Sequence, residues 1–471
     1  MNVFGIGDIA DGITGRVGAV TEVITQPFSD TVIRLGVTGL ARAGKTVFIT
    51  SLVANLLDRA RMTQLSAAPR IMASWLQPQP DDTVPRFDYE AHLAALTGPA
   101  PHWPDSTRTV SELRLSLRLR PSGLLGGMTG PRTVHLDIVD YPGEWLLDLG
   151  LLDKSYDAWA ADALARVAER EQGAAFRAAL GHVTPDARHD EPTAQGLARA
   201  FTDYLTAARA AGFSDCTPGR FLMPGELAGS PALTFAPLPP AADKRGSLRR
   251  EMERRFEAYK AQVVKPFFRD HFSRIDRQVV LVDALGAIHA GPSAVADLRG
   301  AMADLLAAFR PGSNDILSRL LRGKRVEKIL FAATKADHLH HSQHDRLTAI
   351  MQALLRQTRD RADFAGARTA AMAIASLRAT VEQTMTHGGR SVDVVRGTLL
   401  DSGREAAFFP GELPEDPARL LSQATDGAER WLDGAYQAMN FAPAVLRLKP
   451  GEGPPHIRLD RAAEFLIGDR L

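Results

Sequence analysis

The eight residues from Gly39 to Thr46 constrain the fold of this chain more than any other segment. They read Gly-Leu-Ala-Arg-Ala-Gly-Lys-Thr, which matches the pattern G-x-x-x-x-G-K-[S/T] in full. The apolar run 32–38 before them predicts a buried strand, and the apolar residues from Val47 to Leu57 predict a helix. A glycine-rich loop between a strand and a helix predicts phosphate binding, because backbone N–H groups and the helix N-terminus can surround phosphate oxygens.

The positions of this phosphate loop have expected roles in holding a nucleotide with Mg²⁺. Lys45 is expected to reach the outer phosphates, and the Thr46 hydroxyl is expected to bind Mg²⁺. Arg42 could neutralise charge in the transition state of hydrolysis, although it could equally point to solvent or to a partner. The expected nucleotide-binding residues of the loop are Gly39, Ala41, Arg42, Ala43, Gly44, Lys45, Thr46 and Val47.

A second motif, D-x-x-G from Asp140 to Gly143, follows a predicted strand over 133–139. A carboxylate at this strand end is expected beside the phosphate loop, where Asp140 can hold Mg²⁺, usually through water. Gly143 can offer its N–H to a terminal phosphate because no side chain blocks the approach. Glu144 could orient the attacking water; alternatively, because a carboxylate repels the γ-phosphate, its role could be structural.

A threonine between these two motifs is a further candidate for the metal and the catalytic machinery. The segment 106–109 contains Thr107 and Thr109 and precedes a predicted strand over 113–120. A threonine in such a loop can join Mg²⁺ when a γ-phosphate is present, and Thr107 is the preferred candidate. The alternative is a hydroxyl that caps the local backbone.

A third motif, T-K-A-D from Thr334 to Asp337, follows a predicted strand over 326–333 and bears on the base. The Asp337 carboxylate could accept hydrogen bonds from the ring N–H and amino group of guanine, while the Lys335 stem lies along the base. Adenine offers an acceptor and no amino group there, so this motif favours GTP. Ser376 and Leu377 follow the next predicted strand and are candidates for a loop against the base. If Asp337 is only a helix N-cap, an ATPase remains the alternative.

The order of predicted elements gives the fold class. Further strands are predicted over 278–283 and 371–375, and strands alternating with helical patterns indicate a doubly wound, mostly parallel α/β sheet of the P-loop NTPase type. Much of the proline-rich stretch 66–105 is expected to be loop. The predicted organisation is a helical segment (1–31), a GTPase-like core in two halves (32–149 and 273–387), a helical insertion between them (150–272) and a mixed C-terminal segment packed on the core (388–471).

Composition narrows the surroundings in which the chain is expected to work. Hydrophobic residues make up 45% of the chain and charged residues 24%, as in an ordinary globular protein. The formal net charge is +1, so the charge of the chain does not indicate nucleic-acid binding. The single cysteine, Cys216, fits a reducing compartment, and the cytoplasm is expected. No apolar run predicts a transmembrane helix. The apolar stripe within 1–31 indicates a helix docked on the body; peripheral membrane binding is the less favoured alternative.

Four histidines follow Asp337 within a few residues: His338, His340, His341 and His344. No cysteine or paired carboxylate nearby completes an obvious zinc-binding set. The expectation is therefore a solvated loop, and the role of the histidines is open.

Several segments together resemble the YcjX-like family of bacterial P-loop proteins. They are the stretch from Leu35 to Leu57, W-P-D-S-T-R at 103–108, D-Y-P-G-E-W at 140–145 and H-I-R-L-D-R-A-A-E-F-L at 456–466. The resemblance covers nearly all of the chain and implies a GTPase-like core with a helical insertion, a guanine nucleotide and an association with bacterial stress responses. The large separation between Gly143 and Thr334 departs from a minimal signalling GTPase. The family's roles carry over to Lys45, Thr46, Asp140, Gly143, Lys335 and Asp337.

The expected function is a Mg²⁺-dependent, slow GTPase switch. Nucleotide would order the loops near Thr107 and Gly143, and the helical insertion would transmit the change to a protein partner. Two alternatives remain open: an ATPase of the P-loop class, and a nucleotide-stabilised interaction module without significant turnover.

Overall fold

The computed structural model describes most of the chain. The described residues are 30–39, 43–105, 109–121, 130–242, 244–308, 326–363, 367–387, 389–426 and 439–471. Three predicted features lie outside them: residues 1–29 of the N-terminal segment, Ala41 and Arg42 of the phosphate loop, and Thr107. Within the described ranges, no helix is both long and apolar enough to cross a bilayer.

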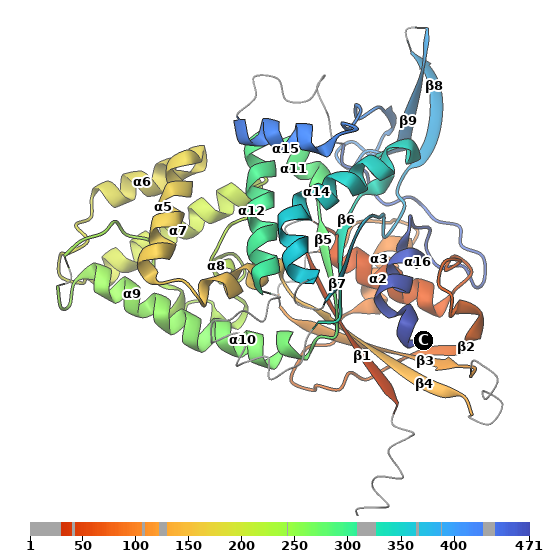
Figure 1. Cartoon of the computed structure of the whole chain (residues 1–471), viewed down its shortest axis with the longest axis horizontal. Helices are drawn as coiled ribbons and strands as arrows, with labels where there is room; N and C mark the ends of the chain where they lie inside the picture. The colour runs from red at the N-terminus through yellow and green to blue at the C-terminus, as the bar shows by residue number, and fades with distance from the viewer. Residues whose placement is uncertain are drawn as a thin grey trace, which may run out of the picture.

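A seven-stranded sheet forms the centre of the molecule, with the strand order β2-β3-β4-β1-β5-β6-β7 (Figure 1). The pairs β4–β1, β1–β5, β5–β6 and β6–β7 are parallel, whereas β2 and β3 run antiparallel to their neighbours. The predicted mostly parallel α/β sheet is therefore confirmed, with an antiparallel edge added to it. The strands are β1 (Thr31–Gly39), β2 (Ile71–Gln77), β3 (Ser111–Leu119), β4 (Arg132–Asp140), β5 (Arg277–Val282), β6 (Lys328–Ala333) and β7 (Arg368–Ala373).

Helices cover both faces of this sheet, which explains why its central strands carry apolar runs, over 279–282 in β5 and 329–333 in β6. Every residue of β5 and β6 is buried. One face packs against α2 (Lys45–Leu57), α3 (Tyr89–Thr97) and α16 (Leu459–Ile467). The other face packs against α11 (Ala284–Ala290), α12 (Pro292–Ala308) and α14 (His344–Asp363).

Helices dominate the stretch between β4 and β5, drawn at the left of Figure 1. Its core is aromatic: the Trp159 ring stacks on Phe256 with a centroid distance of 4.9 Å, and its edge contacts Phe201 and Phe235. These rings are continuous with the core on the α11, α12 and α14 face of the sheet, because Trp159 and Phe256 belong to the same buried apolar cluster as Val280 and Phe331. Its helices are α4 (Gly143–Leu147), α5 (Tyr156–Glu169), α6 (Ala174–Gly181), α7 (Glu191–Ala210), α8 (Gly219–Leu222), α9 (Leu248–Tyr259) and α10 (Lys265–Asp270).

Two regions differ from the sequence prediction. The proline-rich stretch 66–105 contains β2 and α3, which were not predicted, although much of the rest of it is loop as expected. The chain after β7 forms a second, three-stranded antiparallel sheet that was not predicted (Figure 1, upper right). Its strands are β8 (Val381–His387), β9 (Arg390–Thr398) and β10 (Glu405–Phe408), followed by α15 (Pro417–Asp426).

Candidate functional site

A cavity of about 330 Å³ opens where the parallel strands β1, β6 and β7 end. This is the edge at which open α/β sheets bind ligands, and the volume suits a small molecule. Segments far apart in the sequence meet in its wall. The lining residues are Ala43 to Val47, Trp103, Pro104, Thr334, Lys335, Asp337, His338, Ala375 to Leu377, Leu400, Asn440 and Phe441.

The described part of the phosphate loop forms one side of this cavity. Gly44 directly precedes α2 in the left-handed conformation, with φ 77°, which glycine adopts without the penalty of a Cβ. Lys45 and Thr46 are the first two residues of α2, so the positive end of the helix dipole faces the cavity beside the Lys45 side chain. This geometry suits an anion such as a phosphate group.

Asp140 lies beside the phosphate loop although it does not line the cavity. It is the last residue of β4, paired with Val37 of the neighbouring parallel strand β1, and its side chain is 1% exposed. The predicted relationship between the two motifs therefore follows from the register of β4 on β1.

The segment after Asp140 is buried and held by the helical segment that follows it. Gly143 and Glu144 begin α4, all of which is buried, and Glu144 forms an ion pair with Arg209 of α7 at 2.7 Å. Gly219 of α8 lies so close that an added Cβ would be 2.3 Å from the Glu144 carbonyl oxygen. Neither Gly143 nor Glu144 lines the cavity. The Glu144 carboxylate thus has the surroundings of a structural residue.

Asp337 is fixed by the segment that follows β7. Its side chain is buried, its Oδ2 accepts a hydrogen bond from the Ala379 N–H at 2.9 Å, and its carbonyl oxygen accepts one from the Thr380 hydroxyl. The alternative that Asp337 is a helix N-cap is wrong, because it lies inside a three-residue turn whose N-cap is Lys335.

Asp283 is a residue of this site that the sequence analysis missed. It follows β5, caps α11 through the Gly286 N–H at 2.9 Å, and pairs with the Lys335 ammonium group at 2.5 Å. The pairing holds Lys335 along the cavity wall. The sequence does contain a signal for Asp283, since it is an acidic residue between an apolar strand and a helical pattern.

A largely apolar part of the cavity wall, at Trp103, His338 and Phe441, was also not predicted. The His338 ring meets Phe441 edge-on at 5.2 Å, and the Trp103 indole N–H donates to the Phe441 carbonyl at 2.7 Å. Burial lowers the pKa of His338, an effect that nearby Asp337 partly opposes, so the ring is neutral near pH 7. Ser376 and Leu377 line the cavity as expected. A flat heteroaromatic ring fits between such groups.

The four histidines do not form a solvated loop, so that expectation was wrong for most of them. His340 and His344 are buried, and burial lowers the pKa of His344, whose Nε2 lies 2.8 Å from the Ala336 carbonyl oxygen. His341 alone among the four is strongly exposed, at 68% of its side chain.

Comparison with known proteins agrees with the resemblance noted in the sequence. The family described as "YcjX-like family, DUF463" matches residues 33–471. The chain is 40% identical over 461 residues to the Ras-like GTPase YcjX of Escherichia coli K12, covering 93% of this chain and 96% of that protein. It is 36% identical over 472 residues to the Ras-like GTPase YcjX of Shewanella oneidensis, covering 94% of this chain and 95% of that protein. Both the family match and these identities extend over nearly the whole chain, and the protein therefore belongs to the YcjX-like family.

Proposed function

We propose that this protein is a Mg²⁺-dependent guanine-nucleotide-binding protein that hydrolyses GTP slowly, with a P-loop GTPase-like core and a helical insertion over 150–272. The observation that carries the proposal is a single cavity shared by Lys45, Lys335 and Asp337. The relatives support the same function, since both are named Ras-like GTPases.

The nucleotide would lie along the cavity with its phosphates at the N-terminus of α2. Lys45 and the backbone N–H groups of the loop supply the positive charge and hydrogen bonds that phosphate oxygens need. The base would reach Asp337 at the other end, between the Lys335 stem and the apolar wall at Leu377 and Phe441. A buried carboxylate matches the two N–H donors on one edge of guanine and opposes the acceptor of adenine.

Mg²⁺ would bind between the phosphate oxygens and two protein oxygens, the Thr46 hydroxyl and the Asp140 carboxylate. This donor set suits Mg²⁺, a hard cation that prefers oxygen ligands and keeps several waters. The parallel pairing of β4 with β1 supports the assignment of Asp140 because it brings this carboxylate beside the loop. Bound Mg²⁺ would neutralise charge on the outer phosphates. Thr107 and Arg42 remain proposed contributors on the evidence of sequence.

A switch would act through α4, which begins at Gly143. A γ-phosphate that accepts a hydrogen bond from the Gly143 N–H would shift the start of α4. Because Glu144 contacts both α7 and α8, these helices would respond to the shift. Loss of the γ-phosphate would remove this hydrogen bond, and the helical segment 150–272 would transmit the conformational change to a protein partner. Glu144 would then act as a positioning residue through Arg209.

Nucleotide binding to the full chain tests the proposal. GDP, GTP, ADP and ATP are titrated into nucleotide-free protein with Mg²⁺, and phosphate release from GTP is then followed. We expect guanine-selective binding that Lys45→Ala abolishes, and that Lys449→Ala, at an exposed lysine that does not line the cavity, leaves unchanged. Adenine preference, or no binding, would refute the guanine assignment. Tight binding without phosphate release would favour the interaction module instead.

A further inference from the structure

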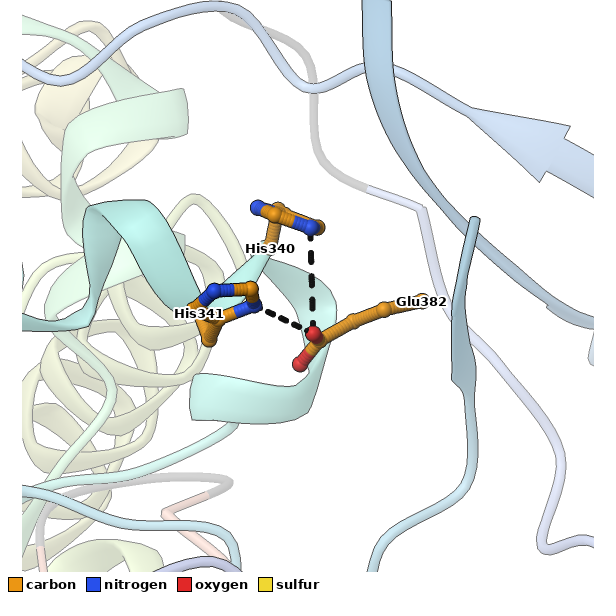
Figure 2. A group of neighbouring side chains, drawn as sticks. All are labelled: His340, His341 and Glu382. Carbon is orange, nitrogen blue, oxygen red and sulfur yellow. Dashed lines mark hydrogen bonds and ion pairs between the residues drawn. The ribbon is translucent and has the colours of Figure 1, made fainter. Parts of the chain in front are cut away.

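Three metal-ligating side chains meet outside the candidate nucleotide site. His340 and His341 follow the Thr334–Asp337 motif, and Glu382 projects toward them from β8 (Figure 2). One ligand atom from each residue lies within 4.8 Å of the other two. No carboxylate for these histidines is evident near them in the sequence, because Glu382 lies 41 residues after His341 and is brought back by the second sheet.

We propose that His340, His341 and Glu382 form a binding site for a divalent transition-metal ion of the zinc class. The Nδ1 atom of His341 lies 2.6 Å from Oε2 of Glu382, and Nε2 of His340 lies 3.8 Å from the same oxygen. Ligand atoms around a tetrahedral Zn²⁺ are about 3.3 Å apart, which small rotations of these side chains would reach. Two imidazoles and one carboxylate, with water in the fourth position, are an established zinc ligand set.

The surroundings of His340 match those of a metal ligand. While Nε2 faces Glu382, the other ring nitrogen, Nδ1, lies 2.9 Å from the Ser342 hydroxyl and 3.5 Å from both the Asp393 carboxylate of β9 and the Ser342 backbone N–H. Metal-bound histidines commonly donate their second N–H to such a carboxylate, which fixes the tautomer and the ring orientation. Asp393 is therefore the outer partner expected for this site.

The surroundings of Glu382 orient its carboxylate in a similar way. Its Oε1 pairs with Arg378 at 3.3 Å, so Oε2 remains directed at the two histidines. The Arg378 charge weakens the attraction for a cation, but it also holds the carboxylate in place. Imidazole nitrogen favours zinc-class ions over Mg²⁺, which separates this site from the one proposed at Asp140.

A bound ion would connect β8 to the turn that follows Asp337. Glu382 lies three residues after Ala379, whose N–H already holds the Asp337 carboxylate. The ion would thus fix both sides of the proposed base-binding loop. This consequence rests on the proposed guanine site, whereas metal binding itself does not.

Titration of Zn²⁺ into the full, nucleotide-free chain, after EDTA treatment and with excess Mg²⁺ present, tests the proposal. We expect one Zn²⁺ per chain, with affinity lowered by about tenfold or more in His341→Ala and in Glu382→Gln, and by a smaller factor in Asp393→Asn. Co²⁺ should give visible absorption typical of tetrahedral coordination, and Glu382→Gln should remove it. Matched controls are His102→Ala and Glu405→Gln, both exposed residues outside the cluster.

Two results would overturn the site. One is the absence of Zn²⁺ binding, which would leave the His341–Glu382 contact as a hydrogen bond within the protein. The other is unchanged stoichiometry and affinity in His341→Ala and Glu382→Gln, which would place the ion elsewhere. Thermal unfolding in EDTA checks that the variants fold as the parent does. GDP titration in EDTA-treated, zinc-free protein with Mg²⁺ restored separates failure of this site from failure of the nucleotide site.

Discussion

The guanidinium of Arg209 on α7 lies 2.7 Å from the carboxylate of Glu144, the residue directly after the D-x-x-G motif. Glu144 is 4% exposed, so this charge has little access to water. The next residue, Trp145, donates its indole N–H to the Met223 carbonyl, and the Arg220 guanidinium covers its ring. The start of α4 is therefore bound to the helical segment 150–272 at several points.

Replacement of Arg209 by alanine is expected to destabilise the protein by about 1–3 kcal/mol, because it leaves the buried Glu144 carboxylate without its ion-pair partner. Urea unfolding followed by tryptophan fluorescence measures the change. Arg199→Ala, at an exposed position of the same helix, serves as the control and should have little effect. Equal unfolding midpoints for the two variants would show that the ion pair adds nothing.

The buried carboxyl group of Asp148 should make stability depend on pH. Burial raises the pKa of Asp148 to about 7 from 3.8, although hydrogen bonds from Tyr259 and from the Gly219 N–H lower it. Between these values the folded chain keeps a proton that the unfolded chain has lost. The stabilisation that this proton gives the folded chain is complete below the pKa of Asp148 in the unfolded chain. It is lost as the pH rises through the pKa of Asp148 in the folded chain.

Asp148→Asn removes this titration. Relative to the parent, the variant should gain stability as the pH rises from about 4 to about 7, by at most about 1.4 kcal/mol per pH unit. Unfolding midpoints over this range measure the difference, with Asp203→Asn on the surface of α7 as the control. A difference that stays constant with pH would contradict the raised pKa.

Asp337→Asn should replace a hydrogen-bond acceptor of the proposed base-binding site with a hydrogen-bond donor. The Ala379 N–H requires an acceptor, so the amide oxygen would remain on it and the amide NH₂ would face the cavity. That group opposes the N–H donors of guanine. We expect GDP affinity to fall at least roughly tenfold, and a diphosphate of xanthine, which has a carbonyl in place of the amino group, to bind better than GDP.

Competition among GDP, ADP and xanthosine diphosphate measures this change in preference. Asp345→Asn, at an exposed aspartate at the start of α14, is the control. An Asp337→Asn protein that keeps its original preference would show that the base is not read by this carboxylate.

Two substitutions of Asp283 separate its two contacts. Asp283→Ala removes both the cap on α11 and the partner of Lys335, and should cost about 1 kcal/mol of stability. Asp283→Ser keeps a capping oxygen, so most of that stability should remain. Both variants free Lys335, and both should weaken GDP binding by similar factors. If Asp283→Ser binds GDP like the parent, the Lys335 contact does not support the site.

Local patterns in the sequence predicted the elements that carry the candidate site. The strand before the phosphate loop and the strands before Asp140 and Thr334 were all found, because each carries buried apolar residues and ends in a distinctive motif. Parallel strands place their carboxyl ends at one edge of a sheet, so the motifs could be expected to meet.

Elements without such a pattern were missed. Strand β2 lies at the edge of the sheet, and only its first residue is buried, so it lacks an apolar run or a clean alternation. Proline residues on either side of it also favoured a loop. The hairpin β8–β9 was missed because β8 is largely exposed and has no apolar run, although β9 buries Val394 and Val395. The apolar wall at Phe441 could not be anticipated, because its partners Trp103 and His338 lie far away in the sequence.

The sequence by itself determined the mostly parallel sheet and its three motifs. The spacing of buried residues, the glycines of a loop and the polar residues at strand ends can each be recognised within a short stretch of consecutive residues. The tertiary structure decided which side chains those motifs face. It paired Glu144 with Arg209, Lys335 with Asp283 and His341 with Glu382. Each of these contacts joins residues more than 40 positions apart, and only the packing of helices and sheets brings such residues within reach of one another.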